Sequence, residues 1–456
     1  MATPAVIVAF LGVVQKMYCS CLSSNTGALN KVPIPHSYGR LSALCSSDPT
    51  WITGVMKSMG VLTNGSVKTV TLKPFGPSAG YFSELAIMEL TYEDGTLPAG
   101  LPTSCIVKFL PVGFEKRLIL DIVQLPRAEC FFYYHLLRHH EQHKMPPLPL
   151  KSPFILYCDY CPETNNSMLI MEKIAGDAVL GDQGKPPCMH QARAMSICLA
   201  KLHAYFWGGR HPKTSVLSTA DSPVIGILAI KMKANTKGML KMLSEYSKFD
   251  VAPSTAAALT STIPDGMGKF LKFTVDSPYN TVVHGDARLD NVFFEAAVPT
   301  SAEPSPPAGT LVAGLYDWAQ GVYAPCYYEM AWTISNSWPP DFVRENEDAL
   351  LRLYWSTLLE EMPADVNKSE LDFDDFLYGY YISHVMCVGK CTVAYESISK
   401  EVHLPSYPHK KKLVMHGLQN SLYLIEKFKV PESISKVIGG KASHRGNKVA
   451  PMPTTK

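Results

Sequence analysis

The side chains best suited to chemistry lie in one short polar loop, residues 284–291, between two apolar runs, 281–283 and 292–294. Apolar strands on either side of a polar loop hold charged groups rigidly at the mouth of a site. Phosphoryl transfer needs a carboxylate near the acceptor hydroxyl and an oxygen ligand for magnesium. Asp286 and Asn291 are five positions apart, so one rigid loop supplies both groups.

A second acidic residue, Asp317, follows an apolar run, 311–316, that we expect to form a strand. Magnesium prefers oxygen ligands, usually one or two carboxylates with phosphate oxygens filling the remaining positions. Asp317 and Asn291 are therefore the candidate magnesium ligands. The alternative is that they are solvated turn residues, which is the ordinary role of a single aspartate in a loop.

The segments HGDARLDNVFF, residues 284–294, and LYDWAQ, residues 315–320, resemble the catalytic core of the aminoglycoside phosphotransferase and choline kinase superfamily. More narrowly, the chain resembles the ecdysteroid-kinase-like (CHK kinase-like) branch over residues 48–430. The resemblance implies an α+β, protein-kinase-like bilobal fold. Its small N-lobe would be built on an antiparallel sheet, its larger C-lobe would be mainly helical, and ATP would bind between them.

The resemblance also implies a role for each polar residue of the loop, and it implies ATP and Mg²⁺ as cofactors. Asp286 would accept the proton of a substrate hydroxyl or orient that hydroxyl. Asn291 and Asp317 would hold the magnesium ion. His284 would shape the loop, and Arg288 would support it or meet a phosphate.

A candidate phosphate contact is Lys108, which lies inside an apolar run, 104–110. Since an unpaired buried lysine is costly, Lys108 either points to solvent from an edge strand or holds phosphates and pairs with a carboxylate. Glu129 is the candidate partner, in a helix that we expect to begin at Pro126. A strand lysine paired with a helix glutamate is the ion pair with which kinases position phosphates.

Residues 66–72 and 82–92 alternate like two strands, and the turn between them contains Gly76 and Gly80. Glycine allows backbone N–H groups to approach phosphates closely, although most such turns are ordinary hairpins. The place of the turn in a kinase-like chain favours a nucleotide-covering hairpin, to which Ser83 would add a hydroxyl contact.

In the same fold, the hinge that binds the adenine edge falls at Met171, Glu172 and Ile174. These residues end the second of two predicted strands, 153–160 and 167–174. Backbone recognition leaves little signature in the side chains, so this assignment rests on the order of the elements.

Helical periodicity predicts the main elements of the C-lobe, and His203 is expected to be a packed core histidine. The sequence Glu329-Met330-Ala331 matches the superfamily segment that begins a helix and braces the catalytic loop. Residues 295–310, rich in Pro, Ala and Ser, predict a loop insertion between the two catalytic strands. The predicted helices span residues 49–59, 189–207, 232–246, 345–361, 370–388 and 410–430.

Composition indicates a globular protein, with 46% hydrophobic and 18% charged residues. The net charge of +2 gives no case for a nucleic-acid partner. The 12 cysteines lack the spacing of a zinc site, so we expect reduced thiols and a cytoplasmic protein. The apolar segment 5–14 is shorter than the roughly 20 residues of a membrane helix. No basic residue precedes it, and a cleaved signal is the alternative.

Four regions are expected along the chain. They are a leader or peripheral arm (1–47), an N-lobe (48–175), a C-lobe with the catalytic loop and a helical substrate subdomain (176–435), and a flexible basic tail (436–456). The sequence does not indicate the oligomeric state.

The predicted function is phosphoryl transfer from ATP to a hydroxyl of a small molecule. The alternative is a catalytically silent nucleotide-binding or scaffold module on the same fold. A protein kinase is disfavoured because HGD stands in place of HRD, and Asp-Trp-Ala in place of Asp-Phe-Gly. The branch suggests a sterol-like or other lipophilic acceptor, while choline or a sugar stays open. Aromatic residues of the C-lobe either line an acceptor pocket or pack in the core: Trp332, Trp338, Tyr354, Trp355, Tyr378, Tyr380 and Tyr381.

Overall fold

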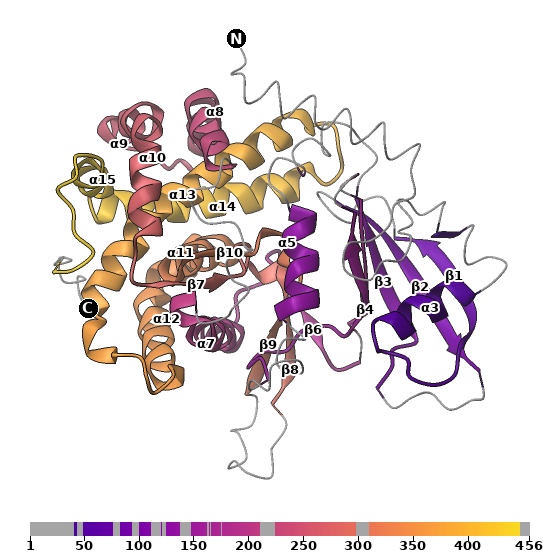
Figure 1. Ribbon diagram of the computed structural model, residues 1–456. Helices are drawn as coiled ribbons and strands as arrows, with labels where there is room; N and C mark the ends of the chain where they lie inside the picture. The colour runs from indigo at the N-terminus through magenta and orange to yellow at the C-terminus, as the bar shows by residue number, and fades with distance from the viewer. Residues whose placement is uncertain are drawn as a thin grey trace. The chain divides into compact units, whose positions relative to one another are not determined.

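The chain forms two compact units in the computed structural model (Figure 1). Unit 1 comprises residues 1–147, 152–176 and 317–320, and unit 2 comprises residues 148–151, 177–316 and 321–456. The structure describes residues 41–42, 49–75, 83–93, 100–110, 120, 125–136, 147–161, 164, 166–174, 176–209, 224–297 and 310–446.

Unit 1 is built on a five-stranded antiparallel sheet in the order β1-β2-β3-β5-β4. Burial alternates along β2 and β3, as in a sheet with one buried face, whereas β4 and β5 are buried over several consecutive residues. The strands are β1 (Val67–Pro74), β2 (Glu84–Tyr92), β3 (Ser104–Phe109), β4 (Ile155–Tyr160) and β5 (Ser167–Glu172). The helices are α3 (Thr50–Ser58) and α5 (Leu125–Phe131), and a π-helical turn, Phe132–Leu136, follows α5.

The position of β3 decides between the two explanations for Lys108. This strand lies in the middle of the sheet, where Lys108 is opposite Leu85 of β2 and Leu169 of β5. Cys105, Val107 and Phe109 are buried on one face, and Lys108 lies half-buried on the other. Lys108 is therefore not on an edge strand.

Unit 2 is mainly helical and contains two small sheets, β6-β8-β9 and β10-β7. The polar loop lies between them, because β7 ends at Val283 and β8 begins at Val292. The second apolar run forms β8, which pairs antiparallel with residues 311–315 as β9. The strands are β6 (Val179–Leu180), β7 (Asn280–Val283), β8 (Val292–Ala296), β9 (Leu311–Leu315) and β10 (Val322–Pro325).

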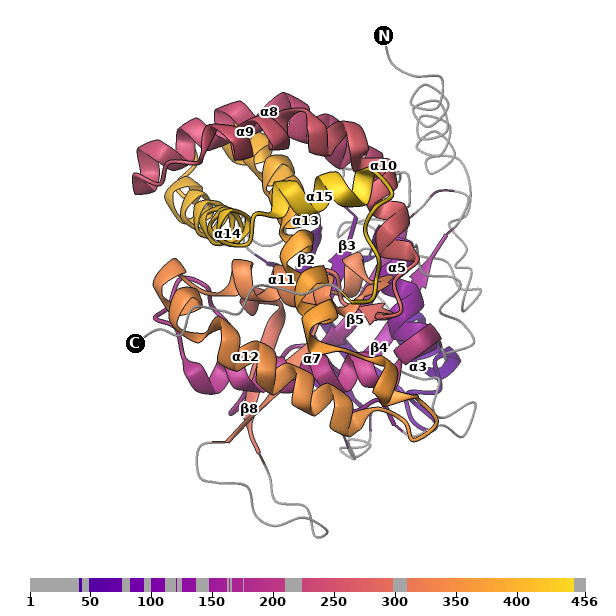
Figure 2. The ribbon, with the colours of Figure 1, turned by 90° about the vertical axis from the view of Figure 1, so that its left-hand side faces the viewer.

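Nine helices make up most of the described part of unit 2 (Figure 2). The pairs α7 and α12, α13 and α14, and α8 and α13 pack extensively against each other, which buries most of α13. The helices of unit 2 are α7 (Met189–Tyr205), α8 (Val224–Ser247), α9 (Pro253–Thr260), α10 (Thr262–Val275), α11 (Cys326–Ser337), α12 (Pro340–Glu361), α13 (Phe373–Lys400), α14 (Tyr407–Lys427) and α15 (Val430–Ile438).

Several predicted helix limits are wrong, each for a local reason. Helix α12 begins at Pro340 instead of residue 345, because proline is well suited to the first turn. Helix α13 continues to Lys400 instead of residue 388, since no helix-breaking proline occurs before the end of its run. The predicted tail from residue 436 begins inside α15, which ends at Ile438.

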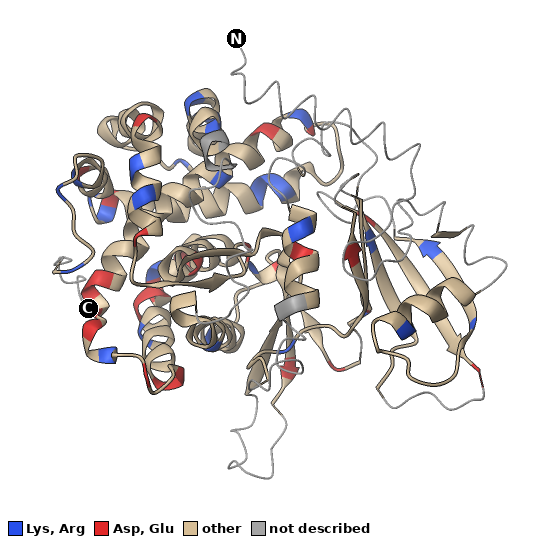
Figure 3. Ribbon diagram, in the orientation of Figure 1, with Lys and Arg blue, Asp and Glu red and all other residues tan. Residues whose placement is uncertain are grey.

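The α+β class, with an antiparallel sheet in the N-terminal part and a mainly helical C-terminal part, is confirmed. Positive and negative side chains are interspersed over the helices of unit 2 (Figure 3). Among the described helices, none combines the length and hydropathy that a membrane span requires. The apolar segment 5–14 and most of the Pro-rich insertion lie outside the described residues.

Candidate active site

The polar loop of unit 2 is shaped by hydrogen bonds of its first residues. Gly285 has φ 78°, a left-handed conformation that glycine adopts without steric cost. The buried His284 accepts a hydrogen bond at Nδ1 from the N–H of Asp286, at 3.3 Å. His284 Nε2 therefore carries the proton and donates it to the carbonyl oxygen of Tyr316, at 2.9 Å. The ring thus ties the loop to the end of β9.

A buried carboxylate, Glu329 of α11, holds the backbone of this loop. Its Oε2 accepts from the N–H of His284 at 2.8 Å, and its Oε1 accepts from the N–H of Gly285 at 2.6 Å. His203 Nε2 of α7 donates to the same carboxylate at 3.0 Å, while His203 Nδ1 lies 2.7 Å from the Tyr354 hydroxyl. The expected bracing by the Glu329 helix and the packed core position of His203 are both confirmed.

The pKa of Glu329 reflects this arrangement. Burial raises the pKa of a carboxyl group, but the hydrogen bonds from the His203 ring and from the backbone N–H of His284 oppose that effect, and the pKa of Glu329 is held below its usual value. The group is fully buried. Its ionised form is therefore the one that fits the three donors around it.

The Asp286 carboxylate is held by three donors. Its Oδ1 accepts from Trp332 Nε1 at 2.9 Å, and its Oδ2 accepts from Asn291 Nδ2 at 3.2 Å and from Arg288 Nε at 3.5 Å. Asn291 Nδ2 also donates to the Asp286 carbonyl oxygen at 2.9 Å. The Asp286 side chain is 13% exposed. This orientation of the Asn291 amide turns its Oδ1 away from Asp286, as a cation ligand would require.

Arg288 is engaged with neighbouring side chains. Its Nη1 donates to Gln183 Oε1 at 3.1 Å and to Asp290 Oδ2 at 3.0 Å. The N–H of Gln183 donates in turn to Asp290 Oδ1 at 3.0 Å. These contacts join the loop to the segment before α7, so in this structure Arg288 supports the loop.

In unit 1, Lys108 forms the centre of a second charged cluster. The predicted ion pair is present, with Lys108 Nζ 2.8 Å from Glu129 Oε1. Lys108 Nζ also lies 2.6 Å from Asp317 Oδ1, a contact that we did not predict. Asp317 has φ 64°, and its N–H donates to the Tyr133 hydroxyl at 3.1 Å. One lysine is therefore shared by two candidate site carboxylates.

Burial and pairing set the pKa values in this cluster. Burial raises the pKa of Glu129 to about 7, with Lys108 opposing this shift and Asp317 adding to it. Burial alone would lower the pKa of Lys108, but the Asp317 and Glu129 carboxylates more than offset it and raise the value. The ammonium is therefore firmly charged near neutral pH.

Asn291 and Asp317, the candidate magnesium ligands, have chemistry that suits this ion. Amide and carboxylate oxygens are the hard donors that Mg²⁺ prefers, with phosphate oxygens and water completing its shell. Asp317 Oδ1 contacts Lys108 in this structure, so the carboxylate would share its charge between the lysine and a cation. Both residues therefore fit the ion.

Comparison with known families gives a clear result. The model of the ecdysteroid kinase-like family matches residues 77–364, which is more than half of the chain. The chain belongs to this family. The match includes Lys108, Glu129, the polar loop and Asp317. No curated protein sequence matches the chain.

Solved structures with a similar course of the chain share little sequence with this family member. A spectinomycin phosphotransferase in complex with ADP and spectinomycin is 12% identical, with a TM-score of 0.38, over 81% of this chain and 98% of its own. An ethanolamine kinase of Plasmodium vivax is 11% identical, with a TM-score of 0.40, over 82% of this chain and 84% of its own. A choline/ethanolamine kinase family protein of Mesorhizobium loti is 12% identical, with a TM-score of 0.42, over 88% of this chain and 99% of its own.

The remaining predicted nucleotide contacts stay predictions. Gly76 and Gly80 lie outside the described residues, and Ser83 directly precedes β2. Met171 and Glu172 end β5, but the N–H of Glu172 donates to the Phe154 carbonyl oxygen at 2.8 Å. That donor is used within the sheet. Ile174 lies just beyond the strand, where its backbone is not part of the ladder.

Several residues that contact the polar loop or the Lys108 cluster are not predicted by the sequence pattern. Trp332 was considered only as pocket lining or core, and Gln183 and Tyr133 carry no local signal of their own. Lys390 of α13 donates to the Gly285 carbonyl oxygen. Its signal was present: a single lysine inside an apolar helical run, as in β3, indicates a paired or partly buried ammonium.

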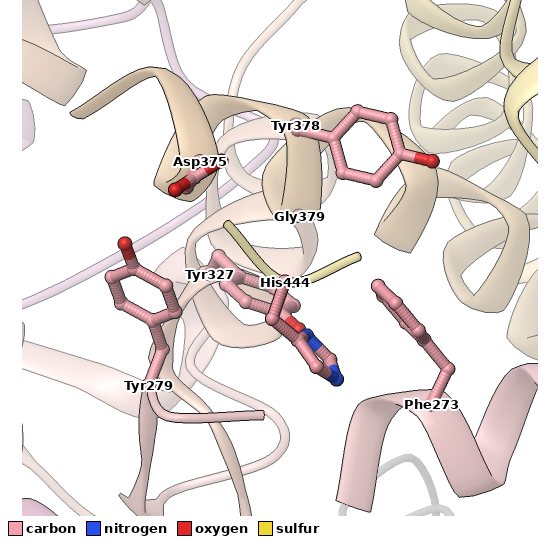
Figure 4. Close-up of a pocket in the computed structure, with 7 residues that line it drawn as sticks. All are labelled: Phe273, Tyr279, Tyr327, Asp375, Tyr378, Gly379 and His444. Atoms are coloured by element: carbon pink, nitrogen blue, oxygen red, sulfur yellow. The ribbon is translucent and has the colours of Figure 1, made fainter. Parts of the chain in front are cut away.

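A separate pocket of unit 2 lies away from the loop (Figure 4). Tyr279 precedes β7 and the loop follows it, so the pocket is at the opposite end of this strand. His444 stacks on Phe273 at 3.9 Å in its wall. Tyr378 lines this pocket, whereas other aromatic residues named above are buried in the core: Trp338, Tyr354, Tyr380 and Tyr381. The residues that line it are Phe273, Tyr279, Tyr327, Asp375, Tyr378, Gly379 and His444.

Proposed function

We propose that this chain transfers the γ-phosphoryl group of ATP to a hydroxyl of a small molecule, with Mg²⁺ as the required metal. The observation that carries the proposal is the held carboxylate of Asp286. Trp332 and Asn291 fix its two oxygens, and the buried Glu329 fixes the backbone beside it. A carboxylate held in this way is suited to receive a proton at a defined point.

Asp286 would accept the proton of the acceptor hydroxyl. As the acceptor oxygen bonds to the γ-phosphorus, the bond from that phosphorus to the β,γ-bridging oxygen breaks, and ADP leaves with the electron pair. Such transfers depend mostly on positioning and on neutralisation of the phosphate charge. Asp286 would contribute the positioning, because it orients the acceptor hydroxyl.

Lys108 would contribute the neutralisation of the phosphate charge. Its ammonium is held by Glu129 in the middle of the sheet, which limits the directions in which it can reach a phosphate. Arg288 would keep the loop in place through Asp290 and Gln183. Asn291 and Asp317 would hold Mg²⁺, which neutralises phosphate charge when it is bound. Met171, Glu172, Ile174 and the turn with Gly76, Gly80 and Ser83 stay candidates for nucleotide contacts.

The acceptor can be identified by a screen. The purified chain is incubated with Mg-ATP and pools of hydroxylated metabolites, including sterols, sugars and amino alcohols, and each pool is examined for ATP-dependent mass gain of one phosphate. We expect one chemical class to gain a phosphate and to lose that gain when EDTA removes the metal.

The same preparation distinguishes the alternative function. Thermal unfolding is followed with and without Mg-ATP. A rise in Tm together with mass gain supports the phosphotransferase. A rise in Tm without mass gain in any pool would favour a silent nucleotide-binding module, and no rise in Tm would contradict both functions.

A further inference from the structure

Lys390 of α13 is a charged residue close to the loop whose role the proposed chemistry does not explain. Helices α11 and α13 pack against each other (Figures 1 and 2). From α13, Lys390 Nζ donates to the carbonyl oxygen of Gly285, the residue before Asp286. The ammonium also lies 4.2 Å from the ring centroid of Trp332 and 5.4 Å from that of Tyr328, both on α11.

The surroundings of Lys390 favour its charged form. Burial would lower the pKa of its ammonium, but Tyr328 and the Asp286 carboxylate more than offset this effect and raise the pKa. Cys387, one turn earlier on α13, also raises the pKa of Lys390. A partly buried cation is therefore kept beside the indole ring and the loop.

The geometry connects Lys390 to Asp286 through Trp332. A cation over an indole face is attracted to the ring. The same cation draws electron density from the ring, which makes the indole N–H a stronger donor. That N–H donates to Asp286 Oδ1 at 2.9 Å. Gly285 is held on both sides, because its N–H donates to Glu329 and its carbonyl accepts from Lys390.

We propose that Lys390 is a positioning residue for Asp286. It fixes the Gly285 carbonyl and the Trp332 indole, and the indole N–H then fixes the direction of the Asp286 carboxylate. This inference rests on the proposed function only for its effect on turnover. The contact chain from Lys390 to Asp286 is a property of the fold and can be tested without an acceptor.

The structural test follows the indole N–H of Trp332. The full-length chain is labelled with ¹⁵N at its 6 tryptophans, and the Trp332 resonance is assigned by its loss in Trp332→Phe. We expect slow hydrogen exchange of this N–H in the unaltered chain. Lys390→Met should increase its exchange rate about tenfold or more, because local opening exposes it, while Lys390→Arg should keep it slow.

The activity test uses whichever acceptor gains phosphate in the screen. Lys390→Met should lower kcat by roughly 10- to 100-fold, since a displaced catalytic group costs that much, with KM for ATP changed less than about twofold. Lys390→Arg should recover most of the loss, and Trp332→Phe should resemble Lys390→Met. The matched control is Lys400→Met, an exposed lysine of the same helix that pairs with Glu396.

The outcomes separate the two proposals. Unchanged exchange of the Trp332 N–H in Lys390→Met would overturn the positioning role, whatever happens to kcat. A loss of thermal stability in Lys390→Met that Lys390→Arg does not restore, without faster exchange of this N–H, would also overturn it. Failure of every acceptor pool would count against the proposed function alone, because the exchange measurement still decides the role of Lys390.

Discussion

The two candidate catalytic clusters hold their carboxylates in different ways. In unit 1, Asp317 and Glu129 both pair directly with one ammonium, that of Lys108. In unit 2, the two oxygens of Asp286 are held mainly by neutral N–H donors, from Trp332 and Asn291, and Arg288 lies farther away at 3.5 Å. In the first cluster the two carboxylates are therefore bound to a cation at short distance, whereas in the second the carboxylate is oriented mainly by neutral donors.

The difference indicates what each cluster must do when a nucleotide arrives. A phosphate that approaches Lys108 competes with Asp317, and the released carboxylate becomes available to a cation. The Asp286 loop needs no such exchange, because the buried Glu329 and its donors hold the backbone in place. We therefore expect the Lys108 cluster to change partners and the loop to be organised in advance.

Substitution of Lys108 tests the exchanging cluster most severely. Lys108→Met leaves the Glu129 and Asp317 carboxylates without their cation. Loss of one partner of a buried ion pair typically lowers the free energy of unfolding by about 3–5 kcal/mol. We expect kcat/KM for ATP to fall about 100- to 1,000-fold, given the usual loss of a phosphate-stabilising donor. Steady-state kinetics and Mg-ATP titration measure this. The control is Lys68→Met on the exposed face of β1, and an equal loss in both variants would contradict the account.

Substitution of Glu329 tests the organised loop. Glu329→Gln leaves one acceptor oxygen for donors that now use two, so we expect the free energy of unfolding to fall by about 2–4 kcal/mol. The expected loss of kcat is about tenfold. Urea unfolding and kinetics measure the two effects, and the exposed Glu360→Gln on α12 is the control. Full activity in Glu329→Gln would show that the loop does not depend on this brace.

His384 of α13 shows what happens to a buried group that has no countercharge. Its Nδ1 lies 3.5 Å from Ser421 Oγ, and among the described residues its Nε2 has no hydrogen-bond partner. Burial lowers the pKa of His384 to about 3. Because the unfolded chain binds this proton more readily, the stability that neutral His384 provides is present above about pH 6.5 and is lost as the pH falls toward 3.

We therefore expect His384→Leu to weaken the dependence of stability on pH in this range. Urea midpoints near pH 7 and pH 5 should differ less in this variant than in the unaltered chain, by an amount corresponding to roughly 1–2 kcal/mol. The exposed His190→Leu is the control. Identical pH dependence with and without His384 would show that its proton does not matter to stability.

The smallest expected effect concerns the aromatic stack beside Asp317. Phe132 and Trp318 are stacked with ring centroids 3.4 Å apart. Phe132→Leu should lower the free energy of unfolding by about 1–2 kcal/mol and leave kcat within about threefold. Differential scanning calorimetry and kinetics measure both. A large loss of ATP affinity would instead mean that the stack controls where Asp317 points.

Much of the fold was predictable because it is encoded locally. Alternating residues predicted the strands 66–72 and 82–92, and apolar runs predicted the other strands of unit 1. A lone lysine within one of these runs predicted its pairing with Glu129, 21 positions away. The polar loop and Glu329 were recognised from residue types at fixed spacing. Helix starts were less predictable, because Pro340 both ends a loop and suits a first helical turn.

The missed contacts join residues whose separation no local pattern encodes. Lys108 and Asp317 are 209 positions apart, and Lys390 and Gly285 are 105 apart. Periodicity identifies which face of an element is buried, but it does not name the partner on another element. Trp332 illustrates this: its helical spacing predicts burial, while its donation to Asp286 depends on how α11 meets the loop.

The most direct test of the central claim, that Asp286 receives the acceptor proton, is turnover by Asp286→Asn with Mg-ATP and the identified acceptor. We expect turnover to fall on the order of 1,000-fold or more, with binding of Mg-ATP retained. The exposed Asp276→Asn should behave like the unaltered chain. Unchanged turnover in Asp286→Asn would contradict the account.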